Sequence, residues 1–392
     1  MWVRRFEDRA RIAANVERAR DAFTGRDVVL KERVQREVDV SLSVAHPAFR
    51  PLCGHVADEG WMAFAHVEGE HLPERPNRDL VVQLLRGLMH LHAAGFAHGD
   101  LKRENLLVAD GRLRIIDLAF AGPLGAPPLG GTPGLLAPEV AAGSPLSVAS
   151  DLFALGRLLE DARDREVRDL ARACLADDPQ ARPASAGSCL AQLGAHVRPW
   201  DRRRLPQPEA EALLAAMPRE GTSVVVPGAA GDLTPVLLAE YWRRGEAVAD
   251  LDLRADPWAA FLGPGEGPLI GRVAATRDVL IVLRSCDTAD EDARDAIVAL
   301  ATALQVRQSG GLLALDADDE LTDRLRAAGA SAIPIDAWTP AQIRDAARDY
   351  GVREDASLLR DIADCSGGNP ALVRHVLAAL ADDPTRPPAD IL

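Results

Sequence analysis

The segment 98–107 (HGDLKRENLL) constrains this chain more than any other stretch. It places a carboxylate, Asp100, a cation, Lys102, and an amide, Asn105, within six residues. Lys102 is also unusual in composition, because the chain has 43 arginines and only two lysines, the other being Lys31. Arginine does not replace lysine where chemistry needs a compact, flexible point charge. We therefore expect both lysines to take part in chemistry.

Together with Asp117 of the following segment 115–119 (IIDLA), these groups are the parts that phosphoryl transfer requires. That reaction needs a carboxylate to accept a hydroxyl proton, cations to spread the charge of the γ-phosphate, and oxygen ligands for Mg²⁺. Asp100 is the candidate carboxylate, and Lys102 is the candidate contact to the γ-phosphate. Asn105 and Asp117 are the candidate magnesium ligands.

These two segments resemble the catalytic loop and the metal-binding motif of the eukaryotic-type serine/threonine protein kinases. Further segments follow in the family's order, at 131–139, 150–156 and 174–183. They resemble the end of the activation segment, the helix that braces the catalytic loop, and the motif that closes the domain. The resemblance implies that Thr132 meets Asp100, that Arg182 pairs with Glu139, that Asp151 braces the catalytic loop and that His98 is a packing residue.

The N-terminal part of the chain resembles the smaller lobe of the same family. The run 28–31 (VVLK) resembles the strand lysine, and 64–69 (FAHVEG) resembles the hinge that holds adenine. The resemblance implies a bilobal α+β protein kinase fold, with an N-lobe at 1–66 and a C-lobe at 67–196, and it implies ATP and Mg²⁺ as cofactors. The implied ATP-binding residues are Val16, Lys31, Glu37, Phe64, Ala65, His66 and Asp117.

Several features depart from the family pattern. The segment 11–19 contains no glycine, although a glycine-rich loop should close over the phosphates there, so we expect weaker ATP binding or help from another surface. The short interval from Lys31 to Glu37 places the glutamate in the first turn of its helix. Gly99 stands where many kinases have an arginine that pairs with a phosphorylated residue, and Thr132 is the single hydroxyl between 118 and 139. We therefore predict no phosphorylation switch in this segment.

Residues 197–208, rich in proline and arginine, predict an exposed linker. Beyond it, strand-like runs alternate with helical ones, which predicts a parallel sheet covered by helices. We expect an α/β core at 209–335, and a helical lid subdomain with the tail at 336–392.

The segment 223–234 (SVVVPGAAGDLT) has the strand, glycine loop and helix of a P-loop, but it lacks the lysine that binds phosphates. This segment, 279–290 and 365–372 resemble a degenerate P-loop NTPase of the STAND class, within the AAA+ relatives. Arg284 and Ser285 stand where that class has an acidic pair, so we expect no hydrolysis. The matching positions are Gly228, Gly231, Thr234, Asp290 and Pro370.

Charge and composition exclude several classes of function. The net charge is −14, and residues 201–392 carry 20 cationic and 32 acidic side chains, which would repel nucleic acid. No apolar run is long enough to span a membrane, and no signal peptide is apparent, so we expect no membrane contact and a cytoplasmic location. The five cysteines are far apart and do not suit zinc.

The sequence thus predicts a serine/threonine protein kinase that acts on a protein hydroxyl. The degenerate second half would regulate it, recruit targets, or make partner or oligomer contacts. The alternative is a pseudokinase and pseudo-NTPase scaffold without turnover, which the missing glycine loop favours. A small-molecule kinase is disfavoured by the segment 137–139 (APE), which builds a peptide-binding platform in the family.

Overall fold

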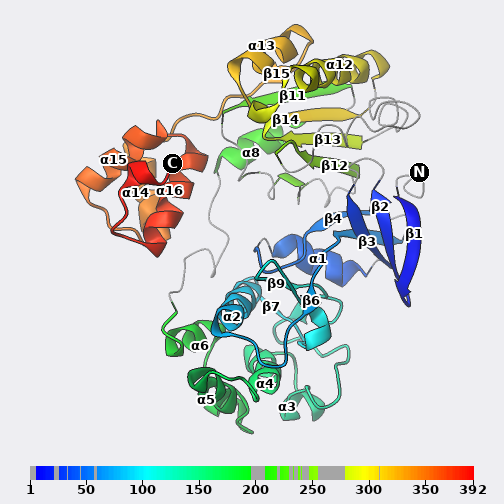
Figure 1. Cartoon of the computed structure of the whole chain (residues 1–392), viewed down its shortest axis with the longest axis vertical. Coiled ribbons are helices and arrows are strands. Elements are labelled where there is room, and N and C mark those ends of the chain that lie inside the picture. Colours follow the sequence, from blue (N-terminus) through cyan, green and yellow to red (C-terminus); the bar gives the residue numbers. More distant parts are fainter. Residues whose placement is uncertain are drawn as a thin grey trace. The chain divides into compact units, whose positions relative to one another are not determined.

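A computed structural model describes the chain as two compact units (Figure 1). One unit comprises Met1–Glu32, Cys53–Phe64 and Pro206–Leu392, and the other comprises Arg33–Leu52 and Ala65–Leu205. The described residues are 6–21, 26–32, 34–44, 46–56, 60–195, 208–218, 221–228, 233, 237–238, 240, 247–254, 279–308 and 310–392. Most of the predicted linker 197–208 lies outside these ranges.

The N-terminal strands form one five-stranded sheet in the order β1-β2-β3-β5-β4. Its core is small and is formed by Phe6, Ala19, Val28, Leu30 and Ala63. The strands are β1 (Phe6–Ala13), β2 (Val16–Asp21), β3 (Asp27–Glu32), β4 (Leu52–Val56) and β5 (Trp61–Ala65).

The hairpin between β1 and β2 is unusually tight. Ala13 pairs with Val16, so only two residues form the turn, and Asn15 takes a positive φ of 59°. The carbonyl of Asn15 accepts a hydrogen bond from the backbone N–H of Glu32 at 3.2 Å. The turn is therefore tied to the end of β3.

The second unit is built around α2 (Arg78–Ala93). Asn77 caps its start by accepting a hydrogen bond from the N–H of Leu80. Its apolar face joins a large core with α4, α5 and α6. The helices of this unit are α1 (Gln35–Ser43), α2, α3 (Pro138–Ala141), α4 (Val148–Leu159), α5 (Arg165–Cys174) and α6 (Ala186–Gln192), with the short helices η2 (Arg103–Asn105) and η3 (Pro179–Ala181).

Short antiparallel strands hold the loops of this unit. The sheet order is β6-β8-β9, and β7 pairs with β10 separately. These strands are β6 (Glu70–His71), β7 (Phe96–Ala97), β8 (Leu106–Ala109), β9 (Arg112–Ile115) and β10 (Gly122–Pro123). Strand β9 ends at Ile115, because the next backbone N–H, of Ile116, bonds to the carbonyl of Asn105 in the catalytic loop.

The second half contains a five-stranded sheet in the order β12-β13-β14-β11-β15. All of its paired strands run parallel, as the alternating pattern predicts. Its strands and helices are α8 (Pro208–Ala215), β11 (Thr222–Pro227), β12 (Ala247–Asp252), β13 (Val279–Arg284), η5 (Cys286–Thr288), α12 (Glu291–Arg307), β14 (Gly311–Ala317), α13 (Asp319–Ala327) and β15 (Ser331–Ala332).

The last part of the chain is helical, with α14 (Pro340–Tyr350), α15 (Ala356–Ser366), α16 (Pro370–Asp382) and η6 (Pro388–Asp390). These helices pack on one another around Ile343, Ile362, Val376 and Leu377, which are buried. Across the described ranges, no helix combines the length and the apolar character that crossing a membrane requires.

Gly87 in the middle of α2 provides a test of this packing. A Cβ added there would lie 2.8 Å from the Cβ of Ala48 and 3.3 Å from Cδ1 of Ile115. We expect Gly87→Ala to destabilise the protein by about 1–3 kcal/mol through overpacking, although alanine favours a helix by about 1 kcal/mol. Urea unfolding would measure this, with the exposed Ala93→Gly as a control for propensity alone. A stabilised Gly87→Ala protein would contradict the packing.

Candidate active site

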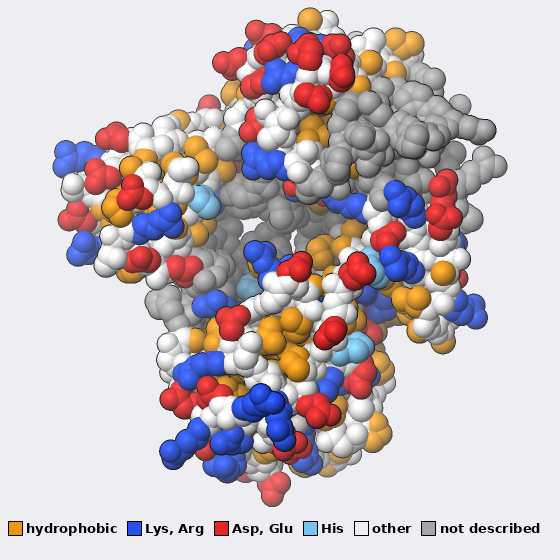
Figure 2. Space-filling model, viewed as in Figure 1, with side chains coloured by type: hydrophobic (Ala, Val, Ile, Leu, Met, Phe, Trp, Pro, Cys, Tyr) orange, Lys and Arg blue, Asp and Glu red, His pale blue; other side chains and the backbone are white. Residues whose placement is uncertain are grey.

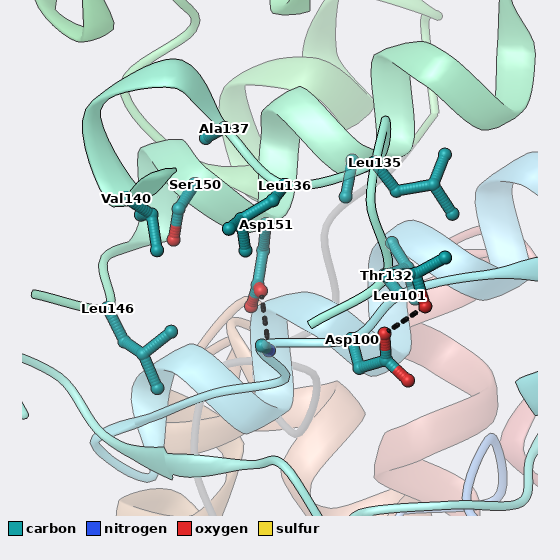
Figure 3. Close-up of a pocket in the computed structure, with 12 residues that line it drawn as sticks. Asp100, Leu101, Thr132, Leu135, Leu136, Ala137, Val140, Leu146, Ser150 and Asp151 are labelled. Carbon is teal, nitrogen blue, oxygen red and sulfur yellow. Dashed lines mark hydrogen bonds between the residues drawn. The ribbon is translucent and has the colours of Figure 1, made fainter. Parts of the chain in front are cut away.

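Two side chains from two segments converge on the carboxylate of Asp100, and Figure 3 shows one of them, Thr132. Oδ1 of Asp100 accepts a hydrogen bond from the hydroxyl of Thr132 at 2.7 Å, and Oδ2 lies 2.7 Å from Nζ of Lys102. Nζ of Lys102 also donates to the hydroxyl of Thr132 at 3.2 Å. The structure therefore brings the predicted base, the predicted lysine and the threonine of the later segment into one cluster.

The environment of Asp100 favours its ionised form. Burial alone would raise the pKa of this carboxyl, but hydrogen bonds from Lys102 and Thr132 outweigh it and hold the pKa below its usual range. Asp100 is therefore a carboxylate at neutral pH. It can orient a hydroxyl group and accept its proton, which is what an attacking alcohol requires.

Asn105 and Asp117 are held beside each other by the backbone. The N–H of Ile116 donates to the carbonyl of Asn105 at 3.0 Å, which places Asp117 next to the catalytic loop. Nδ2 of Asn105 donates to the carbonyl of Asp100 at 2.8 Å, which turns the amide oxygen away from that carbonyl. The donor set, an amide oxygen and a carboxylate, suits Mg²⁺, which prefers oxygen ligands.

The buried carboxylate of Asp151 fixes the catalytic loop from α4. It accepts hydrogen bonds from the backbone N–H groups of His98 at 2.7 Å and Gly99 at 3.0 Å, and it contacts Nε2 of His92 at 2.9 Å. Burial would raise the pKa of Asp151, but the contact with His92 outweighs this and lowers it. Burial lowers the pKa of His98, so that residue is a neutral packing group, as predicted from its position.

An ion pair anchors the end of the activation segment. The guanidinium of Arg182 donates to both carboxylate oxygens of Glu139, at 2.7 and 2.9 Å, and to the carbonyl of Ala149 at 2.9 Å. Its side chain is fully buried and lies over the ring of Phe153, 4.9 Å from the centroid. The pairing implied for Arg182 and Glu139 is therefore present.

Sequence reasoning did not single out the apolar side chains beneath this segment. A small cavity of ≈ 20 Å³ lies between the catalytic loop and the activation segment, large enough for about one water molecule (Figure 3). Its apolar lining comes from Leu135, Leu136, Val140, Leu146 and Ala154. The sequence feature that could have indicated these lining residues is the run of apolar residues around 137–139 (APE).

The residues that the resemblance implies for ATP binding are divided between the two compact units, and each group lies within its own unit. In the first, Val16 pairs with Lys31 on adjacent strands, and Nζ of Lys31 lies 5.9 Å from the ring centroid of Phe64. In the second, Glu37 lies in the first turn of α1, as expected, and accepts a hydrogen bond from the N–H of Leu118 at 3.4 Å.

The predicted hinge keeps part of its backbone occupied. The N–H of Ala65 donates to the carbonyl of Pro51 at 2.9 Å, so this group is engaged within the protein. His66 is half-buried and follows directly.

The motif residues of the second half take structural positions. Asp290 caps α12 by accepting from the N–H of Ala293 at 2.9 Å, and Pro370 is the first residue of α16. A Cβ added at Gly228 would lie 3.7 Å from Nδ2 of Asn369, so the two motifs approach each other. Gly231 and Thr234 lie outside the described residues.

Arg284 closes the carboxyl edge of the parallel sheet. Its guanidinium donates to both oxygens of Asp250, at 2.8 and 3.2 Å, and to Asp252 at 3.0 Å. Ser285 adds a hydrogen bond from its hydroxyl to Asp252 at 2.9 Å, and its N–H donates to Asp316 at 3.1 Å. Burial would lower the pKa of Arg284, but Asp250 outweighs it and raises that pKa, so the guanidinium stays charged.

Comparison with known proteins finds one family that matches part of the first half of the chain. The model of the protein kinase domain family matches residues 26–163. Residues 26–163 of this chain are therefore similar to that family, and the cluster of Asp100, Lys102 and Thr132 lies within the matched region.

Relatives with curated names are serine/threonine-protein kinases. The chain is 29% identical over 207 residues to the probable serine/threonine-protein kinase PkwA of Thermomonospora curvata, covering 41% of this chain and 28% of that protein. It is 35% identical over 101 residues to the serine/threonine-protein kinase PknG of Mycolicibacterium smegmatis, covering 26% and 13%. It is 26% identical over 178 residues to the serine/threonine-protein kinase PLK4 of Nematostella vectensis, covering 37% and 18%. The matched regions thus span less than a third of these relatives.

The ion pair of Arg182 provides a stability test. We expect Arg182→Ala to destabilise the protein by about 3–5 kcal/mol, because it leaves the half-buried carboxylate of Glu139 without its partner. The control is Arg172→Ala, whose side chain is 76% exposed and pairs with Asp169 at the surface. That change should cost less than about 1 kcal/mol. Equal stabilities of the two variants in chemical denaturation would contradict the role given to Arg182.

Proposed function

We propose that the first half of the chain is an ATP- and Mg²⁺-dependent serine/threonine protein kinase. The observation that carries this proposal is the cluster of Asp100, Lys102 and Thr132, in which an ionised carboxylate and a lysine lie within hydrogen-bonding distance of each other. The protein kinase domain and the named relatives support the same class of reaction.

Each residue of the cluster has a part in this reaction. Asp100 orients the hydroxyl of the substrate and accepts its proton. Lys102 sits beside Asp100, where its charge balances the negative charge that builds on the transferred phosphoryl group. Asn105 and Asp117 would hold Mg²⁺, which neutralises charge on the phosphates of ATP when it is bound.

A protein substrate fits this site better than a small molecule does. The activation segment is anchored by the pair of Arg182 and Glu139 and by the hydroxyl of Thr132 at Asp100. Leu129, in the same segment, is 57% exposed and offers an apolar contact. An extended peptide can lie on such a platform.

The two-residue turn at Asn15 favours the alternative, a pseudokinase that binds partners without turnover. Backbone N–H groups of a longer glycine loop would otherwise cover the phosphates. We therefore expect a weak affinity for ATP and a KM for ATP at the upper end of the usual range, on the order of 1 mM.

Phosphoryl transfer by the whole chain tests the proposal directly. The chain should transfer ³²P from Mg-ATP to a generic protein substrate, and Asp100→Asn should lower kcat by at least about 100-fold, because the proton acceptor is lost. Lys31→Met should act mainly on KM for ATP. Asp169→Asn, an exposed carboxylate on α5, is the matched control. Equal background labelling from all four proteins would favour the pseudokinase.

We further infer that the second half is a STAND-type NTPase-like domain without nucleotide turnover, which regulates the kinase or recruits its targets. In open parallel sheets, ligands bind outside the carboxyl ends of the strands. That edge here is filled by the guanidinium of Arg284 and its carboxylate partners Asp250 and Asp252, where Mg²⁺ would need free carboxylates.

The outer helices of this domain support a partner-binding role. Figure 2 shows acidic side chains gathered over α12 and α13. The exposed carboxylates there are Glu291, Asp292, Asp295, Asp319, Glu320 and Asp323. Glu291, Asp295, Glu320 and Asp323 pair with arginines of the same helices, so a partner with basic side chains would have to compete with these pairs or bind Asp292 and Asp319.

Calorimetry with Mg-ATP tests the second half in the full chain. With the first site disabled by Lys31→Met and Asp117→Asn together, we expect no magnesium-dependent binding tighter than about 1 mM. ADP with EDTA is the control for binding without metal. Micromolar, magnesium-dependent binding by this double variant would contradict the inference that Arg284 and its carboxylate partners exclude Mg²⁺ from this edge of the sheet.

A further inference from the structure

Because residue 99 is glycine, the backbone at Phe120 can lie in direct contact with the catalytic loop. Gly99 has a φ of +73°, and a Cβ added there would lie 2.7 Å from the carbonyl oxygen of Phe120. A side chain at this position would have to displace backbone. Backbone of the segment after Asp117 therefore occupies the space where a side chain of residue 99 would begin.

The ring of Phe120 packs against a later part of the same segment, at Gly130. A Cβ added at Gly130 would lie 2.9 Å from Cε1 of Phe120, and one at Gly131 would lie 2.7 Å from Cδ1 of Leu136 and 3.5 Å from the carbonyl oxygen of Gly99. Ring and glycine backbone are thus in van der Waals contact, which larger residues would prevent. The residue after Gly131 is Thr132, which reaches Asp100.

Helix α1 touches the same segment through Arg36. A Cβ added at Gly122 would lie 3.0 Å from Nη1 of Arg36 and 3.5 Å from Cδ1 of Leu146. Nη1 of Arg36 is buried and makes no hydrogen bond within the described ranges. Arg36 therefore approaches this strand through packing, and the helix that carries Glu37 lies against the start of the activation segment.

We propose that Phe120 is a positioning residue that holds the activation segment in its working conformation without phosphorylation. Its ring packs on Gly130 and so places Gly131 and Thr132 over the catalytic loop, where the hydroxyl of Thr132 meets Asp100. Packing thus holds the segment in place, as a phosphate paired with an arginine does in other kinases. This inference rests on the proposed kinase function.

The position of Phe120 makes activity separable from stability. The residue is half-buried rather than part of the central core, so its loss should act on the segment more than on global unfolding. A segment that no longer holds Thr132 at Asp100 would lower the rate of the chemical step. It would leave ATP contacts unchanged.

Steady-state kinetics of the full chain test the proposal. Phe120→Ala should lower kcat by at least about tenfold and change KM for ATP by less than about twofold. Phe120→Leu, which keeps apolar bulk against Gly130, should retain kcat within about threefold. Leu124→Ala removes an apolar side chain that is 37% exposed in the same segment, and it should change neither constant. Phosphatase treatment of the unmodified protein should leave its rate unchanged.

Hydrogen exchange separates this inference from the proposed function. The backbone amides of residues 130–132 should be protected in the unmodified protein and should exchange faster in Phe120→Ala, whether or not the protein transfers phosphate. An inactive protein with this pattern would refute the kinase function and keep the positioning role. Unchanged exchange and kcat in Phe120→Ala, or a rate abolished by phosphatase, would overturn the inference.

Discussion

The hydrogen bonds from the catalytic loop to the buried carboxylate of Asp151 are the constraint on which the active site depends. Two backbone N–H groups, of His98 and Gly99, point at one side chain of α4. An ionised group this deeply buried persists only when several polar partners surround it, and here they are the loop's two N–H groups and the ring of His92. The loop therefore cannot leave its place without stranding a charge, and Asp100 is held in position as a consequence.

At two sites, groups of the chain itself take positions where an added charged group could otherwise bind. In the first half, glycine and an aromatic ring occupy the space where an arginine and a phosphate would pair, so the activation segment needs no added charge at Gly99. In the second half, the guanidinium of Arg284 pairs with the carboxylates of Asp250 and Asp252. Neither arrangement depends on an added phosphate group or on a free ion. Both therefore favour one permanent structure over a structure that switches between two states.

Much of the site could be predicted from residues alone, because the catalytic groups lie close together in the sequence. Asp100, Lys102 and Asn105 fall within six residues, and their backbone geometry follows from the short helix η2 and the strand after it. The ion pair of Arg182 with Glu139 joins residues 43 positions apart, and only the resemblance to a family suggested it. The contact between Phe120 and Gly130 had no signal in the sequence, because many apolar residues next to glycines make no such contact.

The sequence by itself determined the chemistry and the order of the elements. The two lysines and the motifs around Asp117 are the basis on which phosphoryl transfer is proposed, and the alternation of strands and helices predicts the parallel sheet found in the second half. The tertiary structure alone decided which groups are charged and held in place. The pKa of Asp100 depends on the distances to Lys102 and Thr132, and the role of Arg284 depends on a strand that precedes it by more than 30 residues. Such distances arise from packing between distant segments, and local sequence does not encode them.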